Sequence, residues 1–145
     1  MIANPDFGFV VSDGGLGYTW AANSGENRLT PWHNDPVVDM PGEALFLRDE
    51  ETGHVWSPTP MPKRTVEPYL IRHGIGYTIF EHNSHGIRQE MRVFATPNAS
   101  VKVVQLKLKN SLNRTRRITV TYYAEWVLGP DREVTQATIV PEFDA

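Results

Sequence analysis

The sequence predicts an all-β chain of antiparallel hairpins, most simply one or two twisted sheets packed face to face. Three observations indicate this fold. Hydrophobic residues recur at every second position in almost every readable run, and no long window keeps a helical period of 3.6. The same runs are dense in Thr, Val, Ile and Tyr, which strands prefer. Eleven glycines and 11 prolines provide the breaks between short strands.

This alternation predicts three hairpins: residues 7–11 with 16–20, 77–82 with 87–94, and 101–108 with 118–126. Glycines in the break at 12–15 can adopt the positive φ of a tight turn at low cost. The second hairpin turns through 83–86 and the third through 110–113. Residues 43–49 form a further strand, whereas the prolines at 58–62 exclude a central strand there.

Length and composition limit the function. A chain of 145 residues fits one domain, here residues 1–145. The absence of cysteine excludes a disulfide framework, thiolate catalysis and Cys-ligated metals. The net charge is −3, without a long block of one sign, which argues against a nucleic-acid partner. No apolar stretch approaches the roughly 18 residues of a membrane span, and no signal-peptide pattern opens the chain.

Two segments interrupt the alternation, at 22–39 and 56–62. An irregular loop of about 15 residues inside a compact domain is usually functional or disordered, and the aromatic content of the first segment disfavours disorder. Sugars stack on Trp or Tyr faces and are hydrogen-bonded by Asn, Asp, Glu and Arg. The first loop has this mixture, and Trp56 follows it. The four tryptophans also suit core positions, which is the preferred interpretation for Trp20 and Trp126.

Other candidate sites are weaker. Glycoside hydrolysis needs two carboxylates across a cleft, and nothing in the spacing of the acidic residues fixes such a pair: Asp35, Asp39, Glu43, Asp49 and Glu50. His82 and His85, with His73 nearby, are more simply turn and strand-end groups than metal ligands. No serine lies in a Gly-x-Ser-x-Gly context. The arginines at 114, 116 and 117 are best explained as a solvated hairpin tip.

The loop and its neighbours carry a family resemblance. The motifs, in chain order, are Asn23–Pro36, Gly42–Asp49, Val55–Pro60, Arg72–Tyr77, Phe80–Ile87 and Ala124–Gly129. Together they resemble the N-terminal part of the glycoside phosphorylase module of cyclic β-1,2-glucan synthases. The wider family includes cellobiose and chitobiose phosphorylases, with 1,2-β-oligoglucan phosphorylase closest in substrate. One departure is Gly25, where the family pattern has a larger, often basic residue.

The resemblance implies a fold and a division of labour. It implies a galactose-mutarotase-like supersandwich of roughly twice this length, so that the chain is about half of one. A helical linker and an (α/α)6 barrel would follow, carrying the catalytic Asp and the phosphate-binding residues. The parent would be a hexosyltransferase or inverting phosphorylase that uses inorganic phosphate and glucose 1-phosphate. The chain itself is expected to hold no catalytic residue, metal or cofactor.

The resemblance also implies partners and a site. In related phosphorylases a loop of the sandwich reaches the partner subunit's active site. The residues we expect to bind carbohydrate are Arg28, Trp32, Asn34, Asp35 and Trp56. An equally good explanation is that the Asn and Asp turn bonds of the motif brace the sandwich.

Three functions stay open. The leading one is a non-catalytic sandwich of a β-1,2-glucan-processing transferase. The others are a stand-alone carbohydrate-binding module and a purely structural or oligomerisation surface. Expected partners are a β-glucan or oligosaccharide, the rest of the sandwich, the helical barrel and a second copy of the chain. The expected location is the cytoplasm, or the cytoplasmic side of a bacterial inner-membrane protein.

Overall fold

The computed structural model describes residues 1–35, 37–38 and 40–144. Pro36, the last residue of the first motif, Asp39, one of the candidate carboxylates, and Ala145 lie outside the described residues. Ten strands and one short helix are present in this part of the chain: β1 (Ile2–Asn4), β2 (Phe7–Val11), β3 (Leu16–Ala21), β4 (Glu43–Asp49), β5 (Val55–Trp56), β6 (Tyr69–Gly74), β7 (Tyr77–Ser84), β8 (Ile87–Ala95), β9 (Lys102–Asn110), β10 (Ile118–Ala124) and α1 (Arg132–Thr135).

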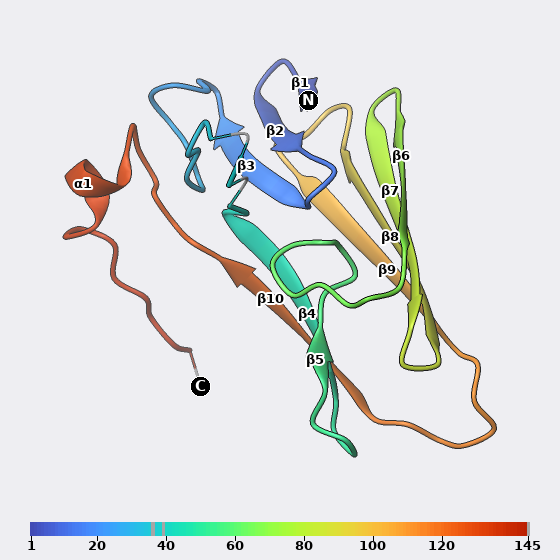
Figure 1. The fold of residues 1–145 in the computed structure, drawn as a ribbon. Helices are drawn as coiled ribbons and strands as arrows, with labels where there is room; N and C mark the ends of the chain where they lie inside the picture. Colours follow the sequence, from blue (N-terminus) through green and yellow to red (C-terminus); the bar gives the residue numbers. More distant parts are fainter. Residues whose placement is uncertain (36, 39, 145) are drawn as a thin grey trace.

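The strands form three antiparallel sheets, which confirms the predicted fold class. The first sheet has the order β1-β2-β3, the second β10-β4-β5 and the third β6-β7-β8-β9. In Figure 1 the third sheet stands on one side and the second sheet on the other, with the first sheet at the upper end between them. β1 lies beside β8 and β3 beside β4, so the first sheet links the other two.

One hydrophobic core joins all three sheets. Its buried side chains come from every sheet: Ile2, Phe7, Phe9, Leu16, Leu45, Leu47, Trp56, Phe80, Ile87, Met91 and Val93. Along β8 every second residue points into this core, because Ile87, Gln89, Met91 and Val93 are all buried. Burying such apolar area contributes roughly 25 cal/mol per Å² and is the main source of the stability of this arrangement.

The first two hairpins are confirmed, with one change in turn length. β2 pairs with β3 and β7 with β8. Asn83 and Ser84 continue the β7 ladder, so the turn contains only His85 and Gly86. Their φ angles are 49° and 72°. A two-residue turn of this kind requires positive φ at both positions, which glycine accepts readily and histidine at some cost.

The third predicted hairpin is wrong. β9 pairs with β8 in the third sheet, and β10 pairs with β4 in the second sheet. The connection at 111–117 crosses from one sheet to the other (Figure 1). The Glu50 backbone N–H donates to the Arg117 carbonyl at 3.0 Å, which sets the start of β10 beside the end of β4. Alternation shows that both segments are strands but does not identify their partners.

The predicted core position is correct for Trp20 and wrong for Trp126. Trp20 is buried, as expected, but Trp126 is 54% exposed. The reason is that β10 ends at Ala124, so Trp126 lies on the irregular segment that leaves the sheet. No helix in the described part of the chain has the length and apolarity needed to cross a bilayer.

Candidate functional site

The loop between β3 and β4 is folded by its own turn residues. The Asn23 side-chain oxygen accepts hydrogen bonds from the backbone N–H groups of Gly25 and Glu26, at 2.8 and 2.9 Å. The Asp35 carboxylate does the same for Val37 and Val38, at 2.9 and 3.2 Å. Short Asn and Asp side chains make such turn bonds readily. The bracing role considered from the sequence is therefore present for these two residues.

A second segment holds the loop from outside. The Arg28 backbone exchanges two hydrogen bonds with Gly129, at 3.1 and 3.0 Å, and the Val127 N–H donates to Leu29 at 2.9 Å. Residues 127–129, which lead from β10 to α1, therefore run alongside the loop. Leu128 has a φ of 53°. Positive φ is costly for a branched residue and is often found where a chain is held for function.

Trp32 is the exposed aromatic residue of this loop. It is 47% exposed, and its indole stacks on the Tyr18 ring with centroids 4.8 Å apart and planes within 2°. Tyr18 is itself buried in β3. The stacking fixes the indole against a rigid strand and leaves about half of its surface open. Such a preorganised aromatic surface is suited to stacking against an apolar sugar face.

Two pockets meet at Trp32. The first, which we call the Tyr18 pocket, measures about 200 Å³ and is lined by Tyr18, Trp32, Asn34 and Asp35 among others. The second, the α1 pocket, measures about 320 Å³ and is lined by Trp32 with Arg28, Asp131, Arg132 and Glu133. Pro31 and His33 line both pockets. Trp32 and three of the other four predicted residues therefore line these two pockets: Arg28 in the α1 pocket, and Asn34 and Asp35 in the Tyr18 pocket.

Trp56 is the exception. It is fully buried in the core, and its Nε1–H donates to the Gln89 side-chain oxygen at 3.0 Å. β5 places it against the inner face of β8, away from the surface. Neither face of the indole is open to a ligand in this arrangement. The apolar positions around it account for its burial.

Glu43 is a buried structural group. Its carboxylate accepts hydrogen bonds from Thr19, Thr30 and Tyr122, and it pairs with Lys102 at 2.7 Å. Burial raises the pKa of this carboxyl, but the Lys102 ammonium and these donors outweigh burial and lower it overall. Four groups, from the three sheets and the loop, thus meet at one carboxylate. The contact with Thr30 supports the base of the loop, since Thr30 lies two residues before Trp32.

His82 and His85, the two histidines considered from the sequence, pack against aromatic side chains. His82 is buried and stacks on Tyr69, with ring centroids 3.7 Å apart. Burial lowers its pKa, and the hydrogen bond to the Pro68 carbonyl opposes that change. The His85 ring packs on Trp56. Among the described residues, no three His, Cys, Asp or Glu side chains are grouped closely enough to hold a metal ion.

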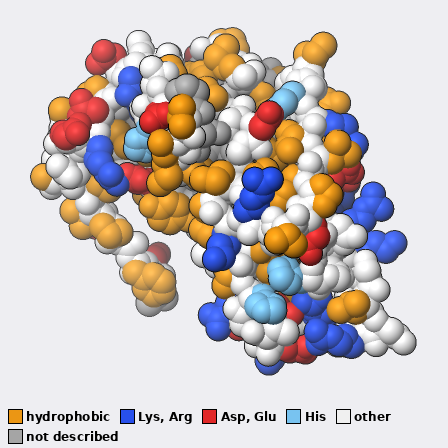
Figure 2. Space-filling model, viewed as in Figure 1, with side chains coloured by type: hydrophobic (Ala, Val, Ile, Leu, Met, Phe, Trp, Pro, Cys, Tyr) orange, Lys and Arg blue, Asp and Glu red, His pale blue; other side chains and the backbone are white. Residues whose placement is uncertain are grey.

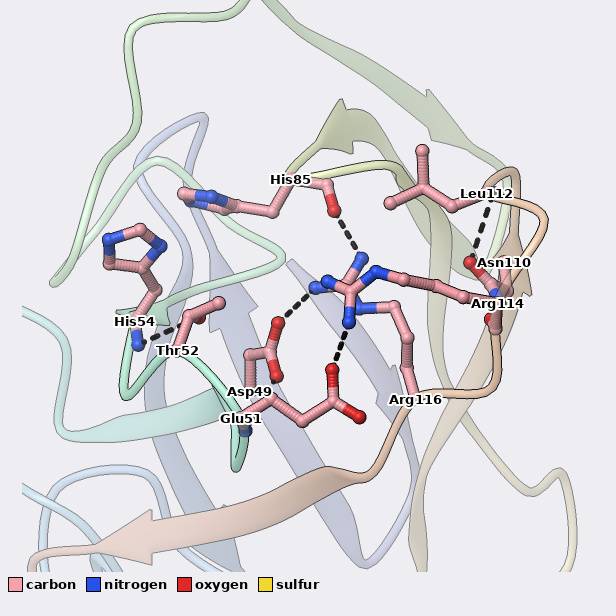
Figure 3. A network of polar contacts seen from close by, with 9 residues as sticks. All are labelled: Asp49, Glu51, Thr52, His54, His85, Asn110, Leu112, Arg114 and Arg116. Carbon is pink, nitrogen blue, oxygen red and sulfur yellow. Dashed lines mark hydrogen bonds and ion pairs between the residues drawn. The ribbon is translucent and has the colours of Figure 1, made fainter.

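A polar network ties the second and third sheets together at the opposite end of the sheets from Trp32. Arg116 donates to the Asp49 carboxylate and to the His85 carbonyl, and Arg114 pairs with Glu51 (Figure 3). The Asp49–Arg116 pair is buried, whereas the Arg114–Glu51 pair is exposed. The predicted solvated tip is therefore only partly correct: Arg114 lies at the surface, and the Arg116 side chain lies inside.

Sequence reasoning missed part of the site. Tyr18 looked like one more alternating strand residue, and nothing in its pattern distinguishes a core tyrosine from one that supports an exposed tryptophan. Asp131, Arg132 and Glu133 lie about 100 residues after the loop in sequence. Their only local signal is Asp131 as the N-cap of α1, whose side chain accepts from the Val134 N–H at 2.9 Å. That signal predicts a helix start and not a pocket.

The comparisons with known proteins agree with this picture. The model of the glycosyl hydrolase 94 supersandwich domain matches residues 1–145. The chain is 37% identical over 145 residues to the cyclic beta-(1,2)-glucan synthase NdvB of Rhizobium meliloti, covering 99% of this chain and 5% of that protein. It is 28% identical over 120 residues to the N,N'-diacetylchitobiose phosphorylase of Vibrio proteolyticus, covering 81% of this chain and 15% of that protein.

A third relative is the solabiose phosphorylase of Paenibacillus borealis, 38% identical over 85 residues, which are 58% of this chain and 11% of that protein. The chain thus spans only a small part of the length of each of these relatives. The resemblance read from the motifs is confirmed, and the family match extends over every sheet described above. The chain belongs to the glycosyl hydrolase 94 supersandwich domain family.

Proposed function

We propose that this chain is a non-catalytic, carbohydrate-contacting sandwich of a β-1,2-glucan-processing transferase or phosphorylase. The observation that carries the proposal is Trp32, a half-exposed indole stacked on a buried tyrosine and flanked by the polar side chains of two pockets. Stacking faces combined with planar hydrogen-bonding groups are the usual means of binding a pyranose. The similarity to a glucan synthase and to disaccharide phosphorylases supports a sugar as the ligand.

We propose that residues outside this chain carry out the chemistry of the parent reaction. Transfer to or from phosphate, with glucose 1-phosphate as the donor or product, would take place on the helical barrel implied by the family resemblance. The candidate carboxylates of the chain have other roles: Glu43 is paired inside the core, Asp49 is held by Arg116, and Asp35 caps a turn. The expected result is that the pure chain releases no glucose 1-phosphate from β-1,2-glucan and phosphate. Turnover by the pure chain would contradict the proposal.

The binding step is tested by NMR titration of the 145-residue chain with β-1,2-linked glucooligosaccharides. The four tryptophan indole N–H groups report on four different positions. We expect the Trp32 signal to shift and the signal of the buried Trp56 to stay in place. Trp32→Ala should abolish binding, whereas Tyr77→Ala, which removes a partly exposed aromatic residue of the third sheet, should leave it unchanged. Equal shifts at all four indoles, or none, would contradict the assignment.

An assembly role is the second candidate. β9 and β10 are each paired on one side only within the described strands. Val120, Tyr122 and Tyr123 on β10 are each about half exposed. Unpaired edges and exposed apolar side chains favour association with further strands or with another chain. We infer that the remaining part of the sandwich, the helical barrel or a second copy covers this region.

We also propose a cellular location for the domain. The kinship with a glucan synthase supports a position in the cytoplasm or on the cytoplasmic side of a bacterial inner membrane. Protease treatment of intact and permeabilised spheroplasts tests it. The domain in its parent protein should be cleaved only after permeabilisation, and cleavage in intact spheroplasts would contradict this location.

A further inference from the structure

We propose that the α1 pocket is a second monosaccharide subsite, so that the Tyr18 pocket and the α1 pocket hold consecutive residues of one β-linked glucan chain on the two sides of the Trp32 wall. This inference rests on the proposed carbohydrate-binding function and adds to it a minimum ligand length and a new set of contact residues, Asp131 and Glu133 with Arg28.

The two pockets share a wall. Pro31, Trp32 and His33 line both, and no other residue is common to them. Their volumes are about 200 and 320 Å³. Small-molecule pockets usually measure roughly 300–1,000 Å³, so the α1 pocket lies at the lower end of this range and the Tyr18 pocket below it, and neither fits a long oligosaccharide. A ligand that uses both pockets must pass over the wall, which is possible for a chain with one sugar unit in each.

The chemistry of the α1 pocket matches sugar hydroxyls. Arg28 supplies guanidinium donors, and Asp131 and Glu133 supply carboxylate acceptors, while Trp32 supplies an apolar surface. A hydroxyl group both donates and accepts, so a pyranose can satisfy both kinds of group at once. Glu133 makes no hydrogen bond or ion pair within the part of the chain that the structure describes, and its carboxylate is therefore available to a ligand.

The charges of the pocket argue for a neutral ligand. Two guanidinium groups, those of Arg28 and Arg132, face two carboxylates, those of Asp131 and Glu133. Arg132 is already paired with Glu125. A phosphorylated sugar would add negative charge next to two carboxylates with only one uncommitted guanidinium to balance it, which costs free energy. An uncharged glucosyl unit meets no such penalty.

The pocket is assembled by the loop and the α1 segment together. The Arg28 backbone is bonded to Gly129, and the Arg28 Nε–H is 3.4 Å from the Ser24 carbonyl. The Asp131 side chain accepts from the Val134 N–H as the cap of α1, which fixes its own carboxylate at the edge of the pocket. Binding to groups that are already held in place loses less conformational entropy than binding to mobile ones. Acidic and basic side chains also lie together at the surface around α1 (Figure 2).

The test compares glucose with its β-1,2-linked disaccharide on the 145-residue chain, by calorimetry and by NMR. We expect the disaccharide to bind at least tenfold more tightly than glucose and to shift both the Trp32 indole signal and the backbone amides of residues 131–133. Glu133→Gln should reduce this preference to less than threefold. Glu142→Gln, which alters an exposed carboxylate of the C-terminal segment, is the matched control and should change nothing.

The outcomes separate the two proposals. If the disaccharide shifts Trp32 but not residues 131–133, and Glu133→Gln binds as the wild type does, the second subsite is refuted while the Trp32 site stands. If neither sugar shifts Trp32, both proposals fail. Amide spectra of Glu133→Gln that match the wild type away from α1 exclude misfolding as the cause of a lost preference.

Discussion

The Arg116 guanidinium donates to the Asp49 carboxylate of the second sheet, from the connection that runs between β9 of the third sheet and β10 of the second. Asp49 is the last residue of β4, and Arg116 lies two residues before β10. The same guanidinium donates to the His85 carbonyl at the β7–β8 turn (Figure 3). Both side chains of the pair are nearly inaccessible, at 3% and 1% exposure. One buried cation therefore fixes the distance between the second and third sheets at this end.

The first prediction concerns acid stability. The Glu51 backbone N–H and the Arg116 guanidinium lower the pKa of Asp49 from 3.8 to about 2. A carboxyl whose pKa is depressed in the folded state stabilises the fold above its unfolded pKa, and this contribution is lost as the pH falls through the folded value. Asp49→Asn should therefore reduce the free energy of unfolding strongly at pH 7, with the difference from the wild type shrinking between about pH 4 and pH 2.

Urea unfolding curves at a series of pH values measure this difference. Glu51→Gln is the control, because its ion pair with Arg114 is exposed and such pairs contribute little, about 0–1 kcal/mol. If the gap between Asp49→Asn and the wild type stays constant from pH 7 to pH 2, the Asp49 carboxylate is not the group that stabilises this end of the sandwich.

The hairpins show which parts of the fold can be predicted from the sequence. The hairpins of β2 with β3 and β7 with β8 follow from local alternation and a short turn. β9 and β10 alternate equally well, but β9 folds back on β8, and β10 pairs with the much earlier strand β4, beside which Asp49 and the His85 carbonyl hold Arg116. The short strands β1 and β5 carry almost no periodic signal, because two or three residues are too few to show one.

The second prediction concerns the buried carboxylate at the base of the loop. Glu43→Gln leaves the Lys102 ammonium without its partner in the core, where that side chain is 9% exposed. Removing one member of a buried ion pair typically costs about 3–5 kcal/mol. We expect Glu43→Gln to lower the free energy of unfolding by this amount, measured by urea denaturation at pH 7.

Two variants check the cause. Glu50→Gln, which breaks an exposed pair with Arg48 at 3.6 Å, should cost about 0–1 kcal/mol. Replacing both partners, as Glu43→Gln with Lys102→Met, should be less destabilising than Glu43→Gln alone, because no unpaired charge remains inside. A double variant that is less stable than the single one would show that the loss arises from packing.

The third prediction concerns Trp56, which was expected from the sequence to bind carbohydrate but is buried in the core. Trp56→Phe removes the indole N–H and leaves the buried Gln89 side-chain oxygen without its donor. An unsatisfied buried polar group costs about 1–3 kcal/mol. We expect a loss of this size in the free energy of unfolding, with no change in the affinity for β-1,2-glucooligosaccharides at temperatures where the variant is folded.

Trp126→Phe provides the comparison, since Trp126 is half exposed and its replacement should change the free energy of unfolding by less than about 0.5 kcal/mol. Weaker sugar binding by folded Trp56→Phe would return Trp56 to the list of ligand contacts.

Part of the candidate site can be predicted from the sequence, and the reason is physical. An irregular loop with Arg, Trp, Asn and Asp can be recognised because its composition differs from that of the strands around it. Whether an aromatic residue of such a segment is exposed depends on what packs over it, and the sequence does not contain that information locally. Trp32 stays at the surface because Tyr18 supports only one side of it, whereas Trp56 is enclosed by side chains of β4 and β8. The α1 pocket depends on the backbone pairing of Arg28 with Gly129. No local sequence pattern indicates that pairing.

The fourth prediction concerns association through β10. Its outer edge has no hydrogen-bonded neighbour in the described strands, and Val120 is half exposed on it. We expect the 145-residue chain to self-associate with rising concentration in light scattering. Val120→Lys should weaken this association at least tenfold, about 1.4 kcal/mol, because a charged side chain opposes pairing at a strand edge. Val66→Lys is the control, because Val66 is almost fully exposed and lies outside the strands, and it should leave the association unchanged. A chain that stays monomeric at every concentration, or the same loss from both lysine variants, would contradict an interface at β10.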